Sequence, residues 1–285
     1  MHFNIGISIS IISKRLLIFV SGLFFSAPTL ADIDEIYHLS IGTNIERYNS
    51  QFSIDSNNQT TGAAVDFEDD LGYDSKISTI WISGWYRVGD LHRIRMTYTP
   101  LVRSARSKST KDLTINNAII KAGATFSADT KTDILDFSYI YSFHKSQQLE
   151  MGISAGIYWL SNNTNIQAAG EIQTENEDQP SFKSDYFTNQ KIQAPMPLIG
   201  ASAIYQITDD WRANMALRYL SVQFNDTDGR IASAELGTEY YFNENWGAGL
   251  SINYFDLDIK TIGLLSNATL GWSHNGLQIY AAFKY

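Results

Sequence analysis

The residue types that most suggest catalysis lie near the C-terminus. Ser273, His274 and Asn275 are consecutive, and Asp256 and Asp258 are two carboxylates separated by one residue. A nucleophile and its base must meet within hydrogen-bond range, whereas adjacent residues of a strand point to opposite faces. Ser273 and His274 therefore cannot easily pair, and no Asp-x-His unit lies within another predicted strand to complement the two aspartates. We do not expect an enzyme.

An acidic cluster occupies residues 66–74. Five carboxylates at this density could hold a divalent cation: Asp66, Glu68, Asp69, Asp70 and Asp74. Their spacing does not match a calcium-binding EF-hand loop, and a solvated loop is the favoured interpretation, with the cation left open. The histidines that follow residue 31 lack metal-ligand spacing, and the chain has no cysteine. We expect no cofactor and no transition-metal site.

A basic cluster follows in the next polar stretch, formed by Arg103, Arg106, Lys108 and Lys111. Such a group could bind phosphates, although a solvated loop explains it equally well.

Alternation of apolar and polar residues predicts the elements that position these groups. We expect about ten strands, with eight as the next choice, near 37–54, 77–88, 91–103, 131–143, 149–164, 192–207, 211–224, 231–242, 246–258 and 264–285. Short turns are predicted at 89–90, 144–148, 208–210 and 243–245. Longer polar connections are predicted at 55–76, 104–130, 165–191, 225–230 and 259–263. We interpret Asn275-Gly276 as a bulge, because both chain ends at one side require an even strand count.

Short turns at one end and long loops at the other are typical of a transmembrane β-barrel. In the strand at 211–219, Trp211, Met215 and Leu217 share one face, while Arg212 and Arg218 share the other. The apolar face is large, and aromatic residues end it next to the short turns, as at a membrane interface: Tyr141, Phe143, Trp211, Tyr240, Phe242, Trp246 and Tyr285. We therefore place the apolar face in lipid and the polar face in the lumen.

Charged residues recur on the predicted lumen face. The basic ones are Arg87, Arg93, Arg95, Arg212, Arg218 and Lys284, and the acidic ones are Glu46, Asp136, Glu150, Glu235 and Glu239. In a narrow lumen such groups should pair, because an unpaired charge away from water is costly. The favoured hypothesis is an ionic network that fills the barrel, and the alternative is a narrow water-filled pore.

The two chain ends carry targeting features. Lys14 and Arg15 precede an apolar run, and small residues follow at Thr29 and Ala31, so we expect residues 1–31 to be a removed secretion signal and residues 32–285 to be one barrel domain. Removal takes away two of the 21 basic and none of the 30 acidic residues, which leaves a net charge of −11. This balance argues against nucleic-acid binding.

The last strand, Leu277 to Tyr285, alternates strictly and ends on an aromatic ring. The chain resembles the small outer-membrane β-barrel families of Gram-negative bacteria, in the broad outer-membrane-protein-A and porin-like group. The resemblance is carried by Val65–Asp74 (VDFEDDLGYD), by the strand-turn-strand unit that ends at His92–Arg95, and by the terminal strand.

The resemblance implies a location in the cell outer membrane, contact with outer-membrane lipid and lipopolysaccharide, and assembly by the barrel-assembly machinery, for which Phe283 and Tyr285 would be the signal. It implies little about substrate. We expect a structural or surface-interaction role. The alternative is a passive channel for a small solute, and an outer-membrane protease or lipid hydrolase is less favoured.

Overall fold

The computed structural model describes residues 33–56, 64–108, 112–115, 118–174, 181–224, 227–262 and 266–285. The predicted secretion signal at residues 1–31 lies outside these ranges. The described residues form thirteen strands: β1 (Tyr37–Ser56), β2 (Ala64–Asp66), β3 (Lys76–Gly89), β4 (His92–Lys108), β5 (Leu113–Ile115), β6 (Ala118–Ile120), β7 (Thr125–Lys145), β8 (Leu149–Thr174), β9 (Ser181–Gln206), β10 (Trp211–Phe224), β11 (Thr227–Tyr241), β12 (Trp246–Ile262) and β13 (Ser266–Lys284).

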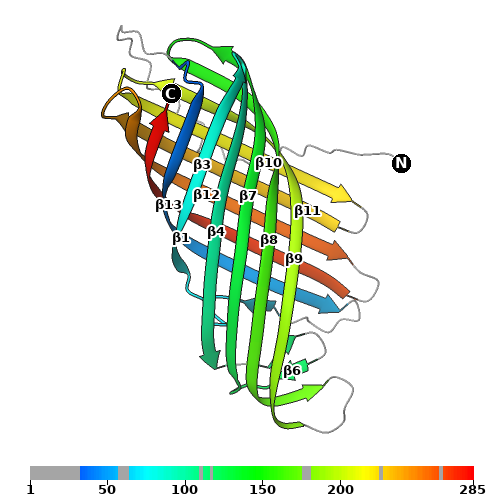
Figure 1. The fold of residues 1–285 in the computed structure, drawn as a ribbon. Helices are drawn as coiled ribbons and strands as arrows, with labels where there is room; N and C mark the ends of the chain where they lie inside the picture. Colours follow the sequence, from blue (N-terminus) through cyan, green and yellow to red (C-terminus); the bar gives the residue numbers. More distant parts are fainter. Residues whose placement is uncertain are drawn as a thin grey trace, which may run out of the picture.

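Ten of these strands close into one antiparallel barrel, as predicted. The order around the wall is β1, β3, β4, β7, β8, β9, β10, β11, β12 and β13, and β13 pairs with β1 to complete the ring. The chain ends meet at the seam, because Tyr285 exchanges backbone hydrogen bonds with Tyr37 at 3.0 Å in both directions. Figure 1 shows the C-terminus beside the start of β1. A closed wall leaves no edge in lipid, which is what a membrane-spanning sheet requires.

The predicted short turns are confirmed, and their sequences explain them. The side chain of Asn243 accepts hydrogen bonds from the backbone N–H groups of Asn245 at 3.0 Å and Trp246 at 2.8 Å. This side-chain cap is a common way to close a tight turn between two strands. All four short turns lie at the same end of the barrel as the C-terminus.

Two of the predicted long loops are largely strand instead, which corrects the expectation for 104–130 and 165–191. β8 and β9 stay paired from Leu149↔Tyr205 to Ile172↔Ser181, and β4 and β7 stay paired as far as Lys108↔Thr125. Asn163 and Asn165 face outward beyond the belt, where water replaces lipid. Asn162 and Thr164 face inward, where they are hydrogen-bonded to Thr132 at 2.8 Å and Thr130 at 3.0 Å, so both faces of the sheet are polar there. The apolar alternation that marks a strand in lipid is therefore lost, although the backbone remains extended.

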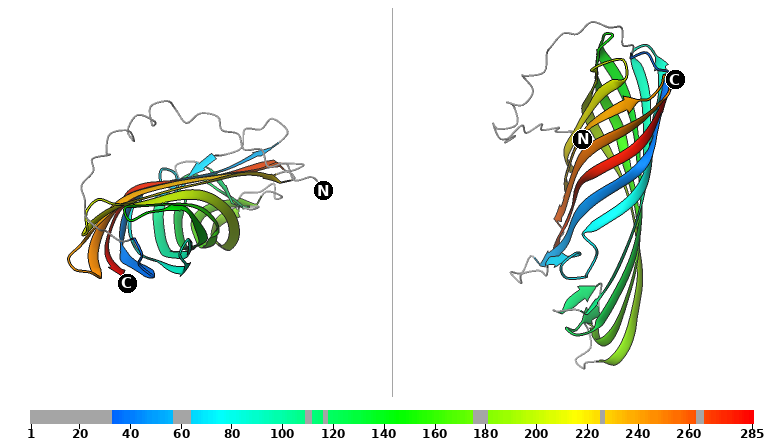
Figure 2. Two further views of the ribbon diagram at one scale, coloured as in Figure 1. Left: turned by 90° about the horizontal axis from the view of Figure 1, so that it is seen from above. Right: turned by 90° about the vertical axis from the view of Figure 1, so that its left-hand side faces the viewer.

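The wall divides at the upper limit of the apolar belt, where Tyr98 and Tyr219 lie. Pairing between β3 and β4 ends at Ile82↔Tyr98, two residues from Pro100 of β4. Pairing between β9 and β10 ends at Ile199↔Tyr219, two residues from Pro197 of β9. Proline has no N–H to offer a ladder. The upper parts of β4, β7, β8 and β9, which we call the extension, thus leave the other strands. Figures 1 and 2 show these long strands running apart from β10–β13.

The outer face carries a continuous apolar belt. Its members are exposed in the isolated chain: Ile41, Ile45, Ile80, Ile82, Met96, Phe137, Ile153, Ile157, Ile199, Met215, Leu217, Leu236, Leu250, Ile252 and Ile279. Aromatic rings bound it at the turn end, as predicted, and Tyr98, Trp159, Tyr219 and Tyr254 bound it at the other end. The assignment of faces is therefore confirmed. Among the described residues, no helix is long and apolar enough to cross a membrane.

The predicted bulge at Asn275-Gly276 is wrong. β13 pairs without a register shift along β1, where Gly276 lies opposite Glu46, and along β12. A Cβ on Gly276 would lie 2.4 Å from the Ile45 carbonyl oxygen and 2.6 Å from Cγ of Glu46. The glycine is needed for a close approach inside the barrel, since it leaves room for the Glu46 side chain.

Candidate functional site

The predicted charged residues line the interior of the barrel. The first cluster lies at the short-turn end. Glu150 of β8 has no exposed surface there. Arg87 donates two hydrogen bonds to its carboxylate, at 2.8 and 3.1 Å, and Nε of Arg93 lies 3.3 Å from it. Ser142 also donates to Glu150. One acid thus holds two guanidinium groups that come from β3 and β4, from which β8 is separated by β7.

The segment before β1 completes this end. Arg87 donates to the carbonyl oxygens of Ile33 and Glu35, both at 3.1 Å, and Ile33 is only 1% exposed. The Glu35 carboxylate pairs with Arg212 of β10. The N-terminal segment is therefore folded across the base of the barrel by two arginines.

Arg212 also binds Glu239 of β11, with Nε–Oε2 and Nη2–Oε2 distances of 2.8 and 2.7 Å. Glu239 accepts further hydrogen bonds from Tyr241 at 2.6 Å and Tyr280 at 3.0 Å, and Nε2 of His38 lies 3.3 Å away. Both members of the Arg212–Glu239 pair are 3% exposed. A buried charge pair with this many hydrogen bonds is fully compensated and rigid.

Lys284 differs from the other predicted basic residues. Its ammonium lies 4.1 Å from the centre of the Tyr241 ring, in a cation–π contact. Within the described residues it forms no ion pair.

Two ion pairs cross the middle of the lumen. Arg95 of β4 reaches Glu235 of β11 at 3.1 Å, and Arg218 of β10 reaches Asp136 of β7. The Arg95–Glu235 side chains are 20% and 22% exposed, so this pair is the wettest of those among the eleven predicted residues. The distinction matters because a partly hydrated pair is easier to break.

Glu46 of β1 lies above these pairs in a polar and aromatic setting. It accepts hydrogen bonds from Tyr48 at 2.5 Å and from Asn253 at 2.6 Å, and Nδ1 of His274 is 3.4 Å away. The His274 ring lies between Tyr48 and Phe255, with both ring centroids 5.0 Å from its own. No basic residue among the eleven predicted ones pairs with Glu46.

Two small cavities adjoin the middle pairs. The larger, of about 110 Å³, is lined by Glu46, Asp136, Arg218 and Asn253, and the smaller, of about 80 Å³, by Arg93, Arg212 and Glu239. Trp81, Arg95 and Glu235 line both. Cavities of this size hold a few water molecules, and the Arg95–Glu235 pair separates them.

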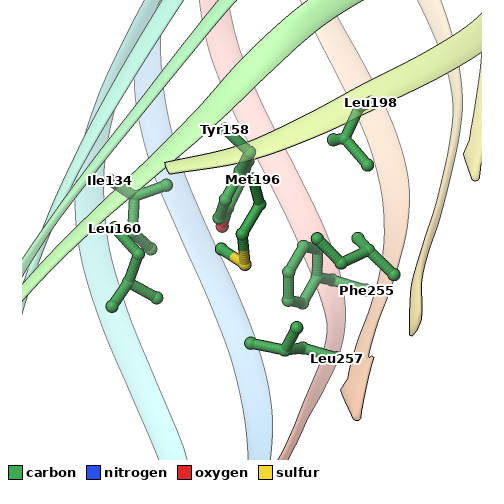
Figure 3. Close-up of a cluster of buried hydrophobic side chains, with 8 residues drawn as sticks. Ile134, Tyr158, Leu160, Met196, Leu198, Phe255 and Leu257 are labelled. Carbon is green, nitrogen blue, oxygen red and sulfur yellow. The ribbon is translucent and has the colours of Figure 1, made fainter. Parts of the chain in front are cut away.

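An apolar layer adjoins the larger cavity, which three of its residues, Ile134, Tyr158 and Phe255, help to line. Figure 3 shows the side chains of this layer. The layer is buried and consists of Ile134, Tyr158, Leu160, Met196, Leu198, Ile231, Phe255 and Leu257. These residues come from β7, β8 and β9 on one side and from β11 and β12 on the other. The layer thus packs the base of the extension against the remaining wall.

The acidic segment after β2 folds onto the inner wall. Glu68 pairs with Arg103 and accepts a hydrogen bond from the Ser50 N–H at 2.8 Å. Tyr73 is 5% exposed and forms a bridge to Ala105. Arg103 and Glu68 are therefore not exposed rim or loop charges, which corrects both interpretations for these two residues, whereas Arg106 and Lys108 are exposed. Lys111 lies outside the described residues.

The remaining chemical candidates are separated. Asp256 is on the outer wall, where it pairs with Arg230 at 3.4 Å, whereas His274 is inside the lumen beside Glu46. Among the described residues, no group of three or more acidic, histidine or cysteine side chains is arranged to hold a metal ion.

Sequence reasoning missed several members of the lumen clusters. His38, Tyr241 and Tyr280 share the parity of the predicted charges, so alternation could have found them. Glu35 precedes the first strand and carries no alternation signal. Glu68 lies in an irregular segment, where the alternation of apolar and polar residues predicts nothing about side-chain direction.

Phe283 and Tyr285 lie at the outer side of the seam. The Phe283 ring lies 4.8 Å from Trp246 and the Tyr285 ring lies 5.4 Å from Tyr37, measured between centroids. Their role as an assembly signal remains a prediction.

No protein-family model and no curated protein matches this sequence. Solved structures share its architecture. The outer membrane protease OmpT from Escherichia coli is 10% identical with a TM-score of 0.58, over 90% of this chain and 99% of that one. The toluene transporter TodX from Pseudomonas putida is 9% identical, with a TM-score of 0.38, over 88% and 90%. The outer membrane protein OprG from Pseudomonas aeruginosa is 10% identical, with a TM-score of 0.36, over 90% and 99%. The likeness to OmpT shows the fold alone, and that fold together with the apolar belt places the chain in the outer membrane of a Gram-negative cell.

Proposed function

We propose that this outer-membrane barrel does not conduct, and that it has a structural or surface-interaction role exerted through the extension. The observation that most supports this proposal is the layer of charge pairs at the short-turn end of the barrel. Glu150, Arg93, Arg212 and Glu239 are all buried there, and the segment at Ile33–Glu35 is folded across them.

The apolar layer supports the same proposal from the other side. A passing ion would have to leave the wet middle of the lumen and cross buried side chains such as Leu160, Met196 and Leu257. Hydrophobic constrictions oppose ion passage because they exclude water. The lumen is thus blocked by two layers of different chemistry.

A narrow channel is the second candidate, and the two adjoining cavities favour it. The Arg95–Glu235 pair between them is partly hydrated, so its opening would join them into one longer space.

We do not propose protease activity for this chain. Asp256 on the outer wall and His274 in the lumen cannot reach a common substrate bond.

Single-channel recording in planar bilayers separates the two candidates. We expect no steady conductance from the native protein, and conductance steps from the combined variant Glu35→Gln/Arg212→Ala/Glu239→Ala/Leu160→Ala/Met196→Ala, which removes the Arg212 charge pairs of the first layer without leaving an unpaired buried carboxylate and reduces the apolar layer as well. Arg230→Ala is the matched control, because its ion pair lies on the outer wall. Steady steps from the native protein would support the channel instead.

A further inference from the structure

A row of hydrogen-bond donors crosses the outer wall at the upper limit of the apolar belt. Lys76 of β3 is directly opposite Arg47 of β1, and Arg47 is directly opposite Asn275 of β13. Asn275 is in turn opposite Tyr254 of β12. Because neighbouring strands lie about 4.8 Å apart, these four residues form one row about 14 Å long, which we call the donor row.

The donor row faces outward. Arg47, Lys76 and Asn275 are exposed, whereas Glu46 and Tyr48, the neighbours of Arg47 in sequence, are 3% exposed and point into the lumen. The row also lies at a defined depth. Tyr37 and Arg47 are ten residues apart on β1, about 33 Å along the strand, and a tilt near 40° reduces this to about 25 Å across the membrane. That is the height of the apolar belt, so Arg47 lies at the level of the lipid head groups. The row runs perpendicular to the tilted strands and crosses this level obliquely, with a change in depth of about 9 Å along its length.

Two like charges stand together in this row without a protein partner. Direct cross-strand neighbours of the same sign repel each other. Among the described residues, neither Arg47 nor Lys76 takes part in an ion pair or a side-chain hydrogen bond. Arg230, by contrast, is exposed on the same outer surface and pairs with Asp256 at 3.4 Å. An anion between Arg47 and Lys76 would replace the repulsion by two attractions.

We propose that the donor row binds a phosphate group carried by a lipid of the outer leaflet. A guanidinium offers two parallel N–H donors to phosphate oxygens, and an ammonium adds a point charge beside them. The Asn275 amide supplies a further donor in the same row. Below the row lie Ile45, two residues from Arg47, and Ile80, four residues from Lys76, which are 52% and 64% exposed and would contact the acyl chains of the same lipid. Free phosphate shares the head-group chemistry but lacks this second contact.

Native mass spectrometry of the detergent-purified barrel tests the site. The probes are lipid A with its phosphates, phosphate-free lipid A, and inorganic phosphate. We expect the native protein to retain phosphorylated lipid A at least tenfold more tightly than phosphate-free lipid A. The double variant Arg47→Ala/Lys76→Ala should lose that preference, and the variant Arg47→Lys/Lys76→Arg, which keeps both charges, should retain most of it.

Lys131→Ala is the matched control, because Lys131 is exposed on β7 above the belt and has a carboxylate on each side of it on the same face, Asp129 and Asp133. Lys76, by contrast, has only Asp74 on one side and a second cation, Arg47, across from it. Its binding should equal that of the native protein. Heat-dependent gel migration of each variant reports that the barrel has folded. Equal retention of phosphorylated lipid A by the native protein and the double alanine variant would overturn the proposal. So would inorganic phosphate binding as tightly as phosphorylated lipid A, since the ligand would then be free phosphate.

Discussion

At the scale of single residues, neighbours in sequence have opposite environments. Leu217 is 49% exposed in the apolar belt, whereas Ala216 is 8% exposed and lines both cavities. We predict that Leu217→Arg destabilises the barrel far more than Ala216→Arg. An arginine facing lipid near the middle of the membrane costs about 2–4 kcal/mol. The lumen arginine reaches water or the Glu235 carboxylate, and crowding is its main cost.

Urea-dependent refolding into lipid vesicles measures the difference, and the yield of folded protein in cells gives a second comparison. Equal losses from the two arginine variants would mean that the lumen is too crowded at Ala216 to accept a long side chain.

Glu35 gives the base of the barrel a dependence on pH. Burial opposes ionisation of this carboxyl, but the charge and hydrogen bond of Arg212 outweigh it, so the pKa of Glu35 is lowered from its ordinary value of 4.5. A carboxyl with a lowered pKa in the folded state stabilises the protein fully above the unfolded value, and this contribution is lost as the pH falls through the folded value. We therefore predict that acid below about pH 4.5 destabilises the native barrel.

The variant Glu35→Gln should lack this part of the acid sensitivity. Thermal unfolding of both proteins between pH 7 and pH 3 measures it, with Glu244→Gln in an exposed turn as the control. Parallel curves for native protein and Glu35→Gln would show that the pair with Arg212 does not contribute.

At the scale of elements, the closing strand β13 joins two kinds of contact. Tyr285 is hydrogen-bonded to β1 and its ring is 64% exposed, and Phe283 packs against Trp246 and Tyr37. We predict that deletion of Tyr285 or the change Phe283→Asp lowers the amount of assembled barrel in the outer membrane. The Tyr285 effect should be mainly a loss of recognition during assembly, since a residue at the interface adds little energy.

Refolding of the purified variants in vesicles separates the two causes. Deletion of Tyr285 should reduce assembly in cells while leaving refolding nearly normal, and Phe283→Asp should reduce both. Normal outer-membrane levels of the two variants would contradict the assigned role of the terminal strand.

The strands in lipid could be predicted from sequence because the membrane imposes a strict alternation on them. Leu217 is apolar and faces lipid, whereas Arg218 is charged and faces the lumen, because adjacent residues of a strand point to opposite faces. The upper strands could not be predicted in this way. Around Asn163 and Asn165 both faces of the sheet carry polar side chains, so polarity carries no information about the backbone, and the pattern at 165–191 predicts a loop.

The lumen pairs show a similar limit. Alternation placed Arg212 and Glu239 on one face, but partners such as Arg87 and Glu150 come from distant strands, and which side chains meet depends on the tilt and stagger of the closed barrel. Glu35 and Glu68 reach the interior from irregular segments. Their positions follow from tertiary packing, which no local pattern encodes.

At the scale of the whole molecule, the barrel has two unequal ends, and their orientation in the membrane can be tested. The short turns and both described chain ends lie together, which is the periplasmic end of outer-membrane barrels, so the extension should rise from the cell surface. Ser104 is exposed on β4 beyond the belt, and Glu244 is exposed in the turn between β11 and β12. The native chain has no cysteine, so single cysteines at these positions give an unambiguous signal.

We predict that Ser104→Cys reacts with a membrane-impermeant maleimide on intact cells, and that Glu244→Cys reacts only after the outer membrane has been permeabilised. The physical reason is that a reagent too polar to cross the bilayer reaches only the side from which it is added. Labelling of both variants after permeabilisation is the control for reactivity of each thiol. The reverse pattern on intact cells would place the short turns outside, and the extension would then have to act in the periplasm rather than at the cell surface.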